Sequence, residues 1–130
     1  TRVFAPHVLR VLGSYAPQIT GLIHNTGGGL TKCLKLGRGI HYVKDDLYEP
    51  DPIFKLIKAE SNEDWRSMCE AFNMGVGFEV LCEPEAADDV VDRFCSMGTM
   101  AKVIGRTLSS AKETNCLTIR GSFGQFKYSA

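Results

Sequence analysis

The stretch whose residue types could do chemistry is His24-Asn25-Thr26-Gly27-Gly28-Gly29, which follows an apolar run and precedes a segment with helical spacing. Glycine has no Cβ, so its backbone adopts positive φ easily and can approach a ligand closely. If a helix opens at about Gly28, its first amide groups have no partner within the helix, and its dipole favours an anion such as phosphate. His24 and Thr26 would add a titratable ring and a hydroxyl.

The same loop also has a plain structural interpretation. Thr26 would cap a helix, and the glycines would only turn the chain. A short glycine-rich run is a weak motif, and a lone histidine is more often structural than catalytic. The residues of the loop alone leave both interpretations open.

Composition predicts an ordinary folded chain. Of 130 residues, 44% are hydrophobic and 23% charged, which suits one globular domain. Fifteen basic and fifteen acidic residues cancel, so we expect neither nucleic acid nor a membrane surface as partner. We also expect no membrane span, since no apolar run approaches eighteen residues, and Thr1-Arg2-Val3-Phe4 is not a signal peptide.

The cysteines and histidines do not group into a metal site. Five cysteines form an odd set without a C-x-x-C pair, and the three histidines are scattered. This pattern favours reduced thiols in a cytoplasmic protein with no metal ligands of its own. Glu85, Asp88 and Asp89 fall in the first turns of a predicted helix, where a solvated face is the expected role.

Apolar spacing of 3.6 residues and proline or glycine boundaries predict the helices. Five helices are predicted. The first begins at Pro6 and ends by Pro17, and the second runs from about Gly28 to Gly37. The third begins at Pro52, the fourth begins near Ser61, and the fifth runs from Pro84 to Gly98. Asp51 is expected to cap the third helix, with Ile53, Phe54, Leu56 and Ile57 on its buried face. Ser61 and Asp64 have the spacing of a capping box for the fourth.

Alternating or β-rich runs predict the strands. After an extended start at residues 1–4, these are residues 19–23, 39–43, 76–82, 100–108, 117–119 and 126–128, with Lys44 in a polar turn after the second. The last two strands read as a hairpin across Gly121 to Gly124. We therefore predict an α+β fold (α/β layered) with a mixed, mainly antiparallel sheet covered by helices.

Two separated motifs carry a resemblance to a known family. The stretch His24 to Gly29, followed by Phe72-Asn73-Met74-Gly75-Val76-Gly77, resembles the C-terminal half of phosphoribosylformylglycinamidine cyclo-ligase, also called aminoimidazole ribonucleotide synthetase. The start at Thr1 to Phe4, the segment Asp51 to Phe54 and the strand at Val103 to Gly105 are also similar. The resemblance spans nearly the whole chain and implies the C-terminal-domain fold of that superfamily.

Related families share the two-domain design, among them selenophosphate synthetase, thiamine-monophosphate kinase and a hydrogenase maturation factor. They tend to carry aspartate where this chain has His24, so the histidine favours the cyclo-ligase. The segment Lys32 to Leu36 differs from the commonest bacterial version, which leaves the branch of the family open.

The resemblance implies a ring closure in purine biosynthesis. Formylglycinamidine ribonucleotide and ATP would give aminoimidazole ribonucleotide, ADP and phosphate. ATP and Mg²⁺ would be bound mainly by an N-terminal domain that residues 1–130 do not contain. The chain is then a single C-terminal domain, inactive alone, whose partners are its own N-terminal domain and, in a full-length homodimer, a second copy.

The resemblance also implies roles for particular residues. His24 is the expected catalytic group, either as an acid or as a stabiliser of charge. Phosphate or ribose-phosphate contact is expected from Thr26, Gly27, Gly28 and Gly29, and substrate contact from Asn73 and Gly75. Asn73 has the alternative of capping the preceding helix.

Arg2 is a possible phosphate partner by its charge, with a solvated side chain as the alternative. Two other readings of the whole chain stay open: a non-catalytic anion-binding module, or a cousin of the selenophosphate synthetase or thiamine-monophosphate kinase type.

Overall fold

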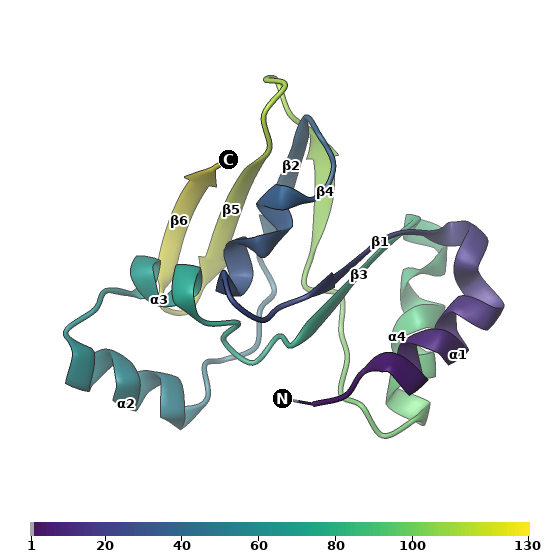
Figure 1. Ribbon diagram of the computed structural model, residues 1–130, viewed down its shortest axis with the longest axis horizontal. Helices are drawn as coiled ribbons and strands as arrows, with labels where there is room; N and C mark the ends of the chain where they lie inside the picture. Colours follow the sequence, from purple (N-terminus) through teal and green to yellow (C-terminus); the bar gives the residue numbers. More distant parts are fainter. Residues whose placement is uncertain (1) are drawn as a thin grey trace. The chain divides into compact units, whose positions relative to one another are not determined.

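The computed structural model describes residues 2–130 as two compact units (Figure 1). The first unit comprises the described residues up to His24 together with Phe78–Val103. The second comprises Asn25–Gly77 and Ile104–Ala130. Thr1, at the head of the predicted extended start, lies outside the described residues.

The first unit pairs two strands with two helices. Its elements are α1 (Ala5–Tyr15), η1 (Ala16–Gln18), β1 (Ile19–His24), β3 (Phe78–Cys82), η3 (Pro84–Ala86) and α4 (Ala87–Ser96). β1 and β3 are antiparallel, with His24 opposite Phe78. The core consists of Val8 and Val11 from α1 together with Ala86, Val90 and Phe94. The predicted helices that begin at Pro6 and Pro84 are therefore confirmed, and their packed faces support the strand pair that ends in His24.

The second unit is built on a four-stranded sheet. Its strands are β2 (Ile40–Lys44), β4 (Gly105–Ser109), β5 (Cys116–Gly121) and β6 (Gly124–Ser129), in the order β4-β2-β5-β6. Only the β2–β5 pair is parallel among these described strands. The predicted mixed, mainly antiparallel sheet and its terminal hairpin are confirmed.

The strand predicted over residues 100–108 begins later than expected. β4 starts at Gly105, which is paired with Lys44 at the end of β2. Because β2 ends at Lys44, the residues before Gly105 have no residue of β2 opposite them. Glycine is required at this start because a Cβ there would collide with the carbonyl oxygen of Val43.

Three helical segments accompany the sheet: η2 (Gly29–Lys35), α2 (Pro52–Ser61) and α3 (Trp65–Ala71). Buried side chains from η2, α3 and β5 form the core of this unit, namely Leu30, Cys33, Met68, Cys69, Leu117 and Ile119. The segment after the glycine loop is a seven-residue 3₁₀ helix, so the prediction of an ordinary α-helix there is wrong. Two successive glycines with positive φ, Gly28 at 92° and Gly29 at 50°, lead into this tighter coil.

The predicted caps of two helices also differ. Ser61 ends α2, and the N-cap of α3 is Asp64, whose Oδ1 accepts the Ser67 N–H at 2.7 Å. α2 starts at Pro52 as predicted, but the Asp51 side chain makes no capping hydrogen bond within the described residues. Its backbone carbonyl accepts the Phe54 N–H instead, at 3.0 Å.

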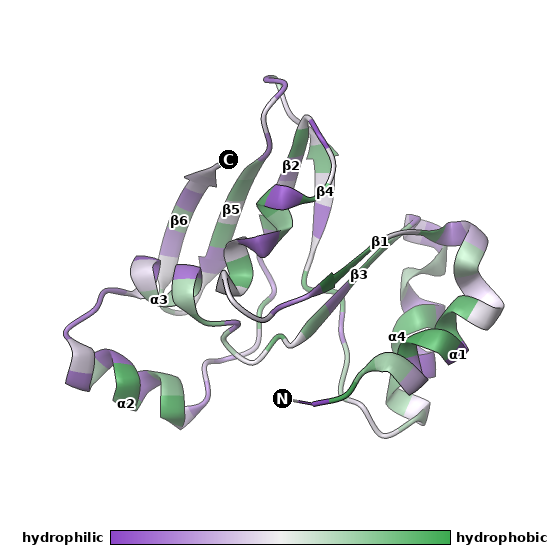
Figure 2. Cartoon of the chain, in the orientation of Figure 1, coloured by the Kyte–Doolittle hydropathy of each residue, from purple (hydrophilic) through white to green (hydrophobic). Residues whose placement is uncertain are grey.

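The expected buried face of α2 is wrong. Among its ten described residues none is buried, and Ile53 and Leu56 are 54% and 56% exposed. Figure 2 shows hydrophobic bands along α2. Phe54 is half-buried and packs against Phe72, with ring centroids 6.1 Å apart. Periodicity correctly identified an apolar stripe, but it could not show that half of the stripe, Ile53 and Leu56, is exposed.

Buried polar groups attach η2 to the sheet. Lys44, predicted in a polar turn, lies within β2 with 3% of its surface exposed, and its Nζ donates to the Leu30 carbonyl at 2.8 Å. The Asn115 Nδ2 donates to the carbonyls of Leu34, Leu36 and Gly37 at 2.9 to 3.0 Å. Each of these buried donors is thereby satisfied by backbone carbonyls of η2 or of the residues that follow it. No helix in residues 2–130 is long and apolar enough to cross a membrane.

Burial in this core predicts a loss of stability in alkali. Burial raises the pKa of the Cys69 thiol from 9.0 to about 11, because an apolar surrounding disfavours the thiolate. The folded state then holds this proton more tightly than the unfolded chain does. The stabilisation is complete below pH 9.0 and is lost as the pH rises through about 11.

We therefore expect the free energy of unfolding, measured by urea denaturation, to fall between pH 9.0 and about 11. Cys69→Ala should make the fall smaller, with a remainder from Tyr128, whose pKa burial also raises. Cys95→Ala makes the same substitution at an exposed position and is the matched control. An equally steep fall in Cys69→Ala would contradict the prediction.

Candidate functional site

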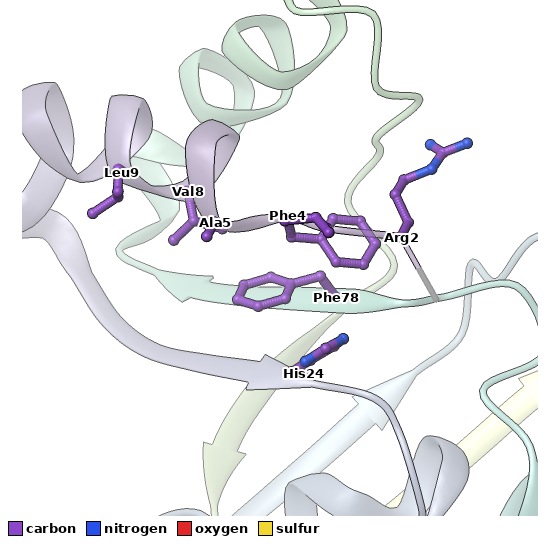
Figure 3. Close-up of a pocket in the computed structure, with 8 residues that line it drawn as sticks. Arg2, Phe4, Ala5, Val8, Leu9, His24 and Phe78 are labelled. Carbon is purple, nitrogen blue, oxygen red and sulfur yellow. The ribbon is translucent and has the colours of Figure 1, made fainter.

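His24 lies at the end of β1, and its ring belongs to a cluster of three rings with Phe4 and Phe78 (Figure 3). Its centroid is 5.8 Å from that of Phe4, in an edge-on arrangement, and 5.9 Å from that of Phe78. The three rings border a hollow of about 540 Å³ whose other lining residues are Arg2, Val3, Ala5, Val8 and Leu9. His24 itself is exposed, and its ring is in contact with both phenylalanines.

The glycine loop presents backbone donors to solvent. Residues 26–29 form a turn in which the Gly29 N–H donates to the Thr26 carbonyl at 3.3 Å. Gly27 and Gly28 are exposed, and their N–H groups donate to no acceptor within residues 2–130. Gly29 is buried, so it shapes the loop and does not offer a surface to a ligand.

A lysine that the sequence analysis did not select completes this loop. The Lys32 Nζ donates to the Thr26 Oγ1 at 2.8 Å. The hydroxyl therefore serves as an acceptor for Lys32 and keeps its own proton for another acceptor. Thr26 is not the cap of the helix, since the N-cap residue is Gly28. No pattern in the sequence marked Lys32, because its contact with Thr26 exists only in the folded loop.

The second motif forms a tight turn. The Val76 N–H donates to the Asn73 carbonyl at 2.9 Å, and the two central residues, Met74 and Gly75, have φ of 51° and 93°. Positive φ at both central positions is typical of a type I′ turn. The Asn73 Oδ1 accepts the Gly75 N–H at 3.0 Å. The Asn73 side chain is thus part of the turn that follows α3.

Asp51 makes the surroundings of Gly75 unfavourable for an anion. A Cβ on Gly75 would lie 3.7 Å from the Asp51 Oδ2. The Gly75 amide is already donated to Asn73. A phosphate is therefore better accommodated beside Gly27 and Gly28, where a cation and not a carboxylate is adjacent.

Hydrogen bonds hold the two motifs together within the second unit. Asn25 donates its backbone N–H to Gly77 at 2.9 Å and its Nδ2 to the Val76 carbonyl at 3.0 Å. The Asn73 Nδ2 donates to the Asn25 carbonyl at 3.1 Å. The structure therefore brings the predicted residues of both glycine motifs together, whereas His24 belongs to the first unit.

Acidic side chains do not assemble a metal site in the described part of the chain. No three His, Cys, Asp or Glu side chains of residues 2–130 lie close enough to hold an ion. Glu85, Asp88 and Asp89 are exposed along η3 and α4, as predicted for a solvated face. Arg2 is exposed as well, and in Figure 3 its guanidinium extends away from the three rings.

The chain is similar in sequence to curated proteins named phosphoribosylformylglycinamidine cyclo-ligase. Identity is 37% over 105 residues with that of Methanopyrus kandleri, 36% over 110 with that of Methanocaldococcus jannaschii, and 35% over 112 with that of Synechocystis. These matches cover 81%, 85% and 83% of the chain. The predicted resemblance is confirmed, although no protein-family model matches the chain.

The chain spans only about a third of the length of these relatives, 30% to 32%. A match of this extent is what one domain of such an enzyme would give. Among solved structures, Escherichia coli HypE, a hydrogenase maturation protein, superposes with a TM-score of 0.65 over 98% of this chain and 38% of its own. At 19% identity this likeness shows a shared fold and confirms the predicted fold class.

The three glycines of the loop predict unequal effects on stability. An added Cβ at Gly29 would collide with the Phe72 carbonyl oxygen and lie 2.6 Å from that of Cys69, and φ is positive there. Gly29→Ala should therefore lower the free energy of unfolding by about 2 kcal/mol or more. A Cβ at Gly27 meets nothing within 4 Å. Gly27→Ala is the matched control.

Urea denaturation of the two variants tests the difference. Gly27→Ala should stay within about 0.5 kcal/mol of the parent chain. Equal losses in the two variants would show that the loop is not held as described.

Proposed function

We propose that this chain, similar to about a third of phosphoribosylformylglycinamidine cyclo-ligase, is the C-terminal domain of an enzyme with that activity. The full-length enzyme would convert formylglycinamidine ribonucleotide and ATP into aminoimidazole ribonucleotide, ADP and phosphate. It would act in the cytoplasm as a homodimer. The sequence similarity carries this proposal, and the exposed glycine loop supplies groups suited to it.

The loop would bind a phosphate of the substrate or of ATP. The amides of Gly27 and Gly28, the Thr26 hydroxyl and the Lys32 ammonium are all donors, and all lie on one short segment. Backbone amides in such a turn form a concavity that suits an anion, and the ammonium adds a full positive charge. Because η2 is a short 3₁₀ helix, we assign the binding to these individual donors and not to a helix dipole.

The reaction needs positioning and stabilisation of charge. In the proposed sequence the γ-phosphoryl group of ATP passes to the formyl oxygen of the substrate. The amidine nitrogen then attacks the formyl carbon and loses a proton. The ring closes, and phosphate leaves with the former formyl oxygen. His24 would donate a hydrogen bond or a proton to the phosphoryl or amide oxygen as negative charge grows there.

ATP and Mg²⁺ would be held mainly by an N-terminal domain. When bound, Mg²⁺ neutralises charge on the transferring phosphates. The donors of the glycine loop fit a phosphate group but not a metal ion. The proposal therefore assigns no metal ligand to this chain, and the isolated 130 residues should not catalyse ring closure.

A non-catalytic anion-binding module is the alternative. It is favoured by the fact that all the donors of the loop belong to one compact unit. The coding sequence upstream of Thr1 distinguishes the two: an ATP-binding half there supports the cyclo-ligase. A cousin of the selenophosphate synthetase or thiamine-monophosphate kinase type would differ in the substrate that the two-domain protein binds.

Substitution of His24 tests its catalytic role in the two-domain enzyme. His24→Phe keeps an aromatic ring beside Phe4 and Phe78 but removes both nitrogens. We expect kcat for ring closure to fall by about a hundredfold or more, the usual range for losing an acid or base, while the melting temperature changes little. The assay is formation of aminoimidazole ribonucleotide.

His24→Ala should lose activity to a similar extent and lose stability in addition, because the ring contacts disappear. Full activity in His24→Phe would return the histidine to a packing role.

Binding of inorganic phosphate tests the loop in the 130-residue chain. We expect saturable changes in the amide NMR signals of Gly27 and Gly28. Lys32→Gln should weaken the affinity about threefold to tenfold, as for loss of an exposed charged hydrogen bond. Lys35→Gln removes the same charge from an exposed position three residues on and is the control. Equal effects of the two substitutions would mean that phosphate senses net charge and not the loop.

A further inference from the structure

The two glycine motifs are joined by asparagine side chains from distant parts of the sequence. Asn25 and Asn73 are 48 positions apart, yet the Asn73 Nδ2 donates to the Asn25 carbonyl at 3.1 Å. In the opposite direction, the Asn25 Nδ2 donates to the Val76 carbonyl at 3.0 Å. Each loop thus supplies a side-chain amide to the backbone of the other. We call these two bonds the asparagine clamp.

Loss of either hydrogen bond of the clamp should destabilise the two loops. Asn25 is 2% exposed, so water cannot readily replace a lost partner. The Asn73 amide uses both ends, because its Oδ1 accepts the Gly75 N–H at 3.0 Å while its Nδ2 reaches Asn25. The turn that it organises contains Met74 at φ 51°, a conformation that costs a non-glycine residue energy.

Only an amide meets these demands at position 73. One end must accept from a backbone N–H and the other must donate to a backbone carbonyl. Aspartate keeps the acceptor but directs a second negatively charged oxygen at the Asn25 carbonyl. Serine can accept from Gly75 as in an ST turn, but it is too short to make both bonds.

We propose that Asn25 and Asn73 are positioning residues: the asparagine clamp fixes the backbone directly before Thr26, and thereby the orientation of the exposed amides of Gly27 and Gly28. Asn73 then affects anion binding without touching the anion. In this proposal Asn73 neither contacts the substrate nor caps α3. Its side chain instead accepts from one backbone N–H and donates to one backbone carbonyl. Only the effect on ligand binding rests on the proposed function; the effect on the loop does not.

Hydrogen exchange in the 130-residue chain tests the clamp itself. The Asn25 N–H donates to Gly77 beside the clamp, so its protection reports whether the loops stay together. Asn73→Asp and Asn73→Ser should speed its exchange about tenfold or more, whereas amides in the centre of β5 should keep parent-like protection. Asn62→Asp makes the same chemical change at an exposed residue and is the control.

Phosphate titration of the same variants tests the consequence for the loop. Asn73→Asp and Asn73→Ser should both weaken binding at Gly27 and Gly28, and Asn62→Asp should not. The serine variant adds no charge, so weaker binding in that variant could not be explained by repulsion between phosphate and a new carboxylate. If the parent chain binds no phosphate, the proposed function fails at this step, but exchange at Asn25 still decides whether the clamp exists.

Two results would overturn the inference. One is unchanged exchange at the Asn25 N–H in both Asn73 variants. The other is a uniform rise in exchange over the whole second unit, which would show general destabilisation in place of local positioning. Should Asn73→Asp fail to fold, the serine variant, which adds no charge, still supports both measurements.

Discussion

The site depends on one arrangement: hydrogen bonds of a buried residue hold the start of the glycine loop, while the glycines that follow are exposed to solvent. Asn25 is buried and bonded to Val76 and Gly77, whereas Gly27 and Gly28 are exposed. A flexible glycine run would otherwise sample many conformations, and ordering it on binding would weaken affinity. The paired loops supply that order in advance, so their amides can meet an anion without a large entropic cost.

The core beneath the loop serves the same purpose. Gly29 packs so closely on the carbonyls of Cys69 and Phe72 that no side chain fits, which joins the start of η2 to the end of α3. The Lys44 ammonium attaches Leu30 near the start of η2 to the sheet, and the Asn115 amide attaches the end of η2 and the residues that follow it. The buried charge of Lys44 is tolerated only with a good hydrogen-bond partner, and the Leu30 carbonyl provides one. The loop is therefore positioned by a network and not by one contact.

Much of the fold follows from local sequence, and the rest depends on which elements meet. Regular spacing predicted α1, α4 and the terminal hairpin correctly because each depends on residues that are close together in the sequence. The start of β4 was misjudged because it is set by the end of its partner β2. The exposure of Ile53 and Leu56 could not be foreseen because periodicity does not show what covers a stripe. Within the site, residue types identified the glycine loops, but Lys32 and Asn25 became visible only through the contacts that the folded chain gives them.

The central claim is that the amides after His24 hold a phosphate of the reacting molecules. The most direct measurement is a crystal structure of the two-domain enzyme with formylglycinamidine ribonucleotide and an unreactive ATP analogue bound. The account predicts a phosphate oxygen within about 3 Å of the Gly27 or Gly28 nitrogen, the usual length of such a hydrogen bond. Both ligands bound in full, with every phosphate distant from Gly27 and Gly28, would contradict it.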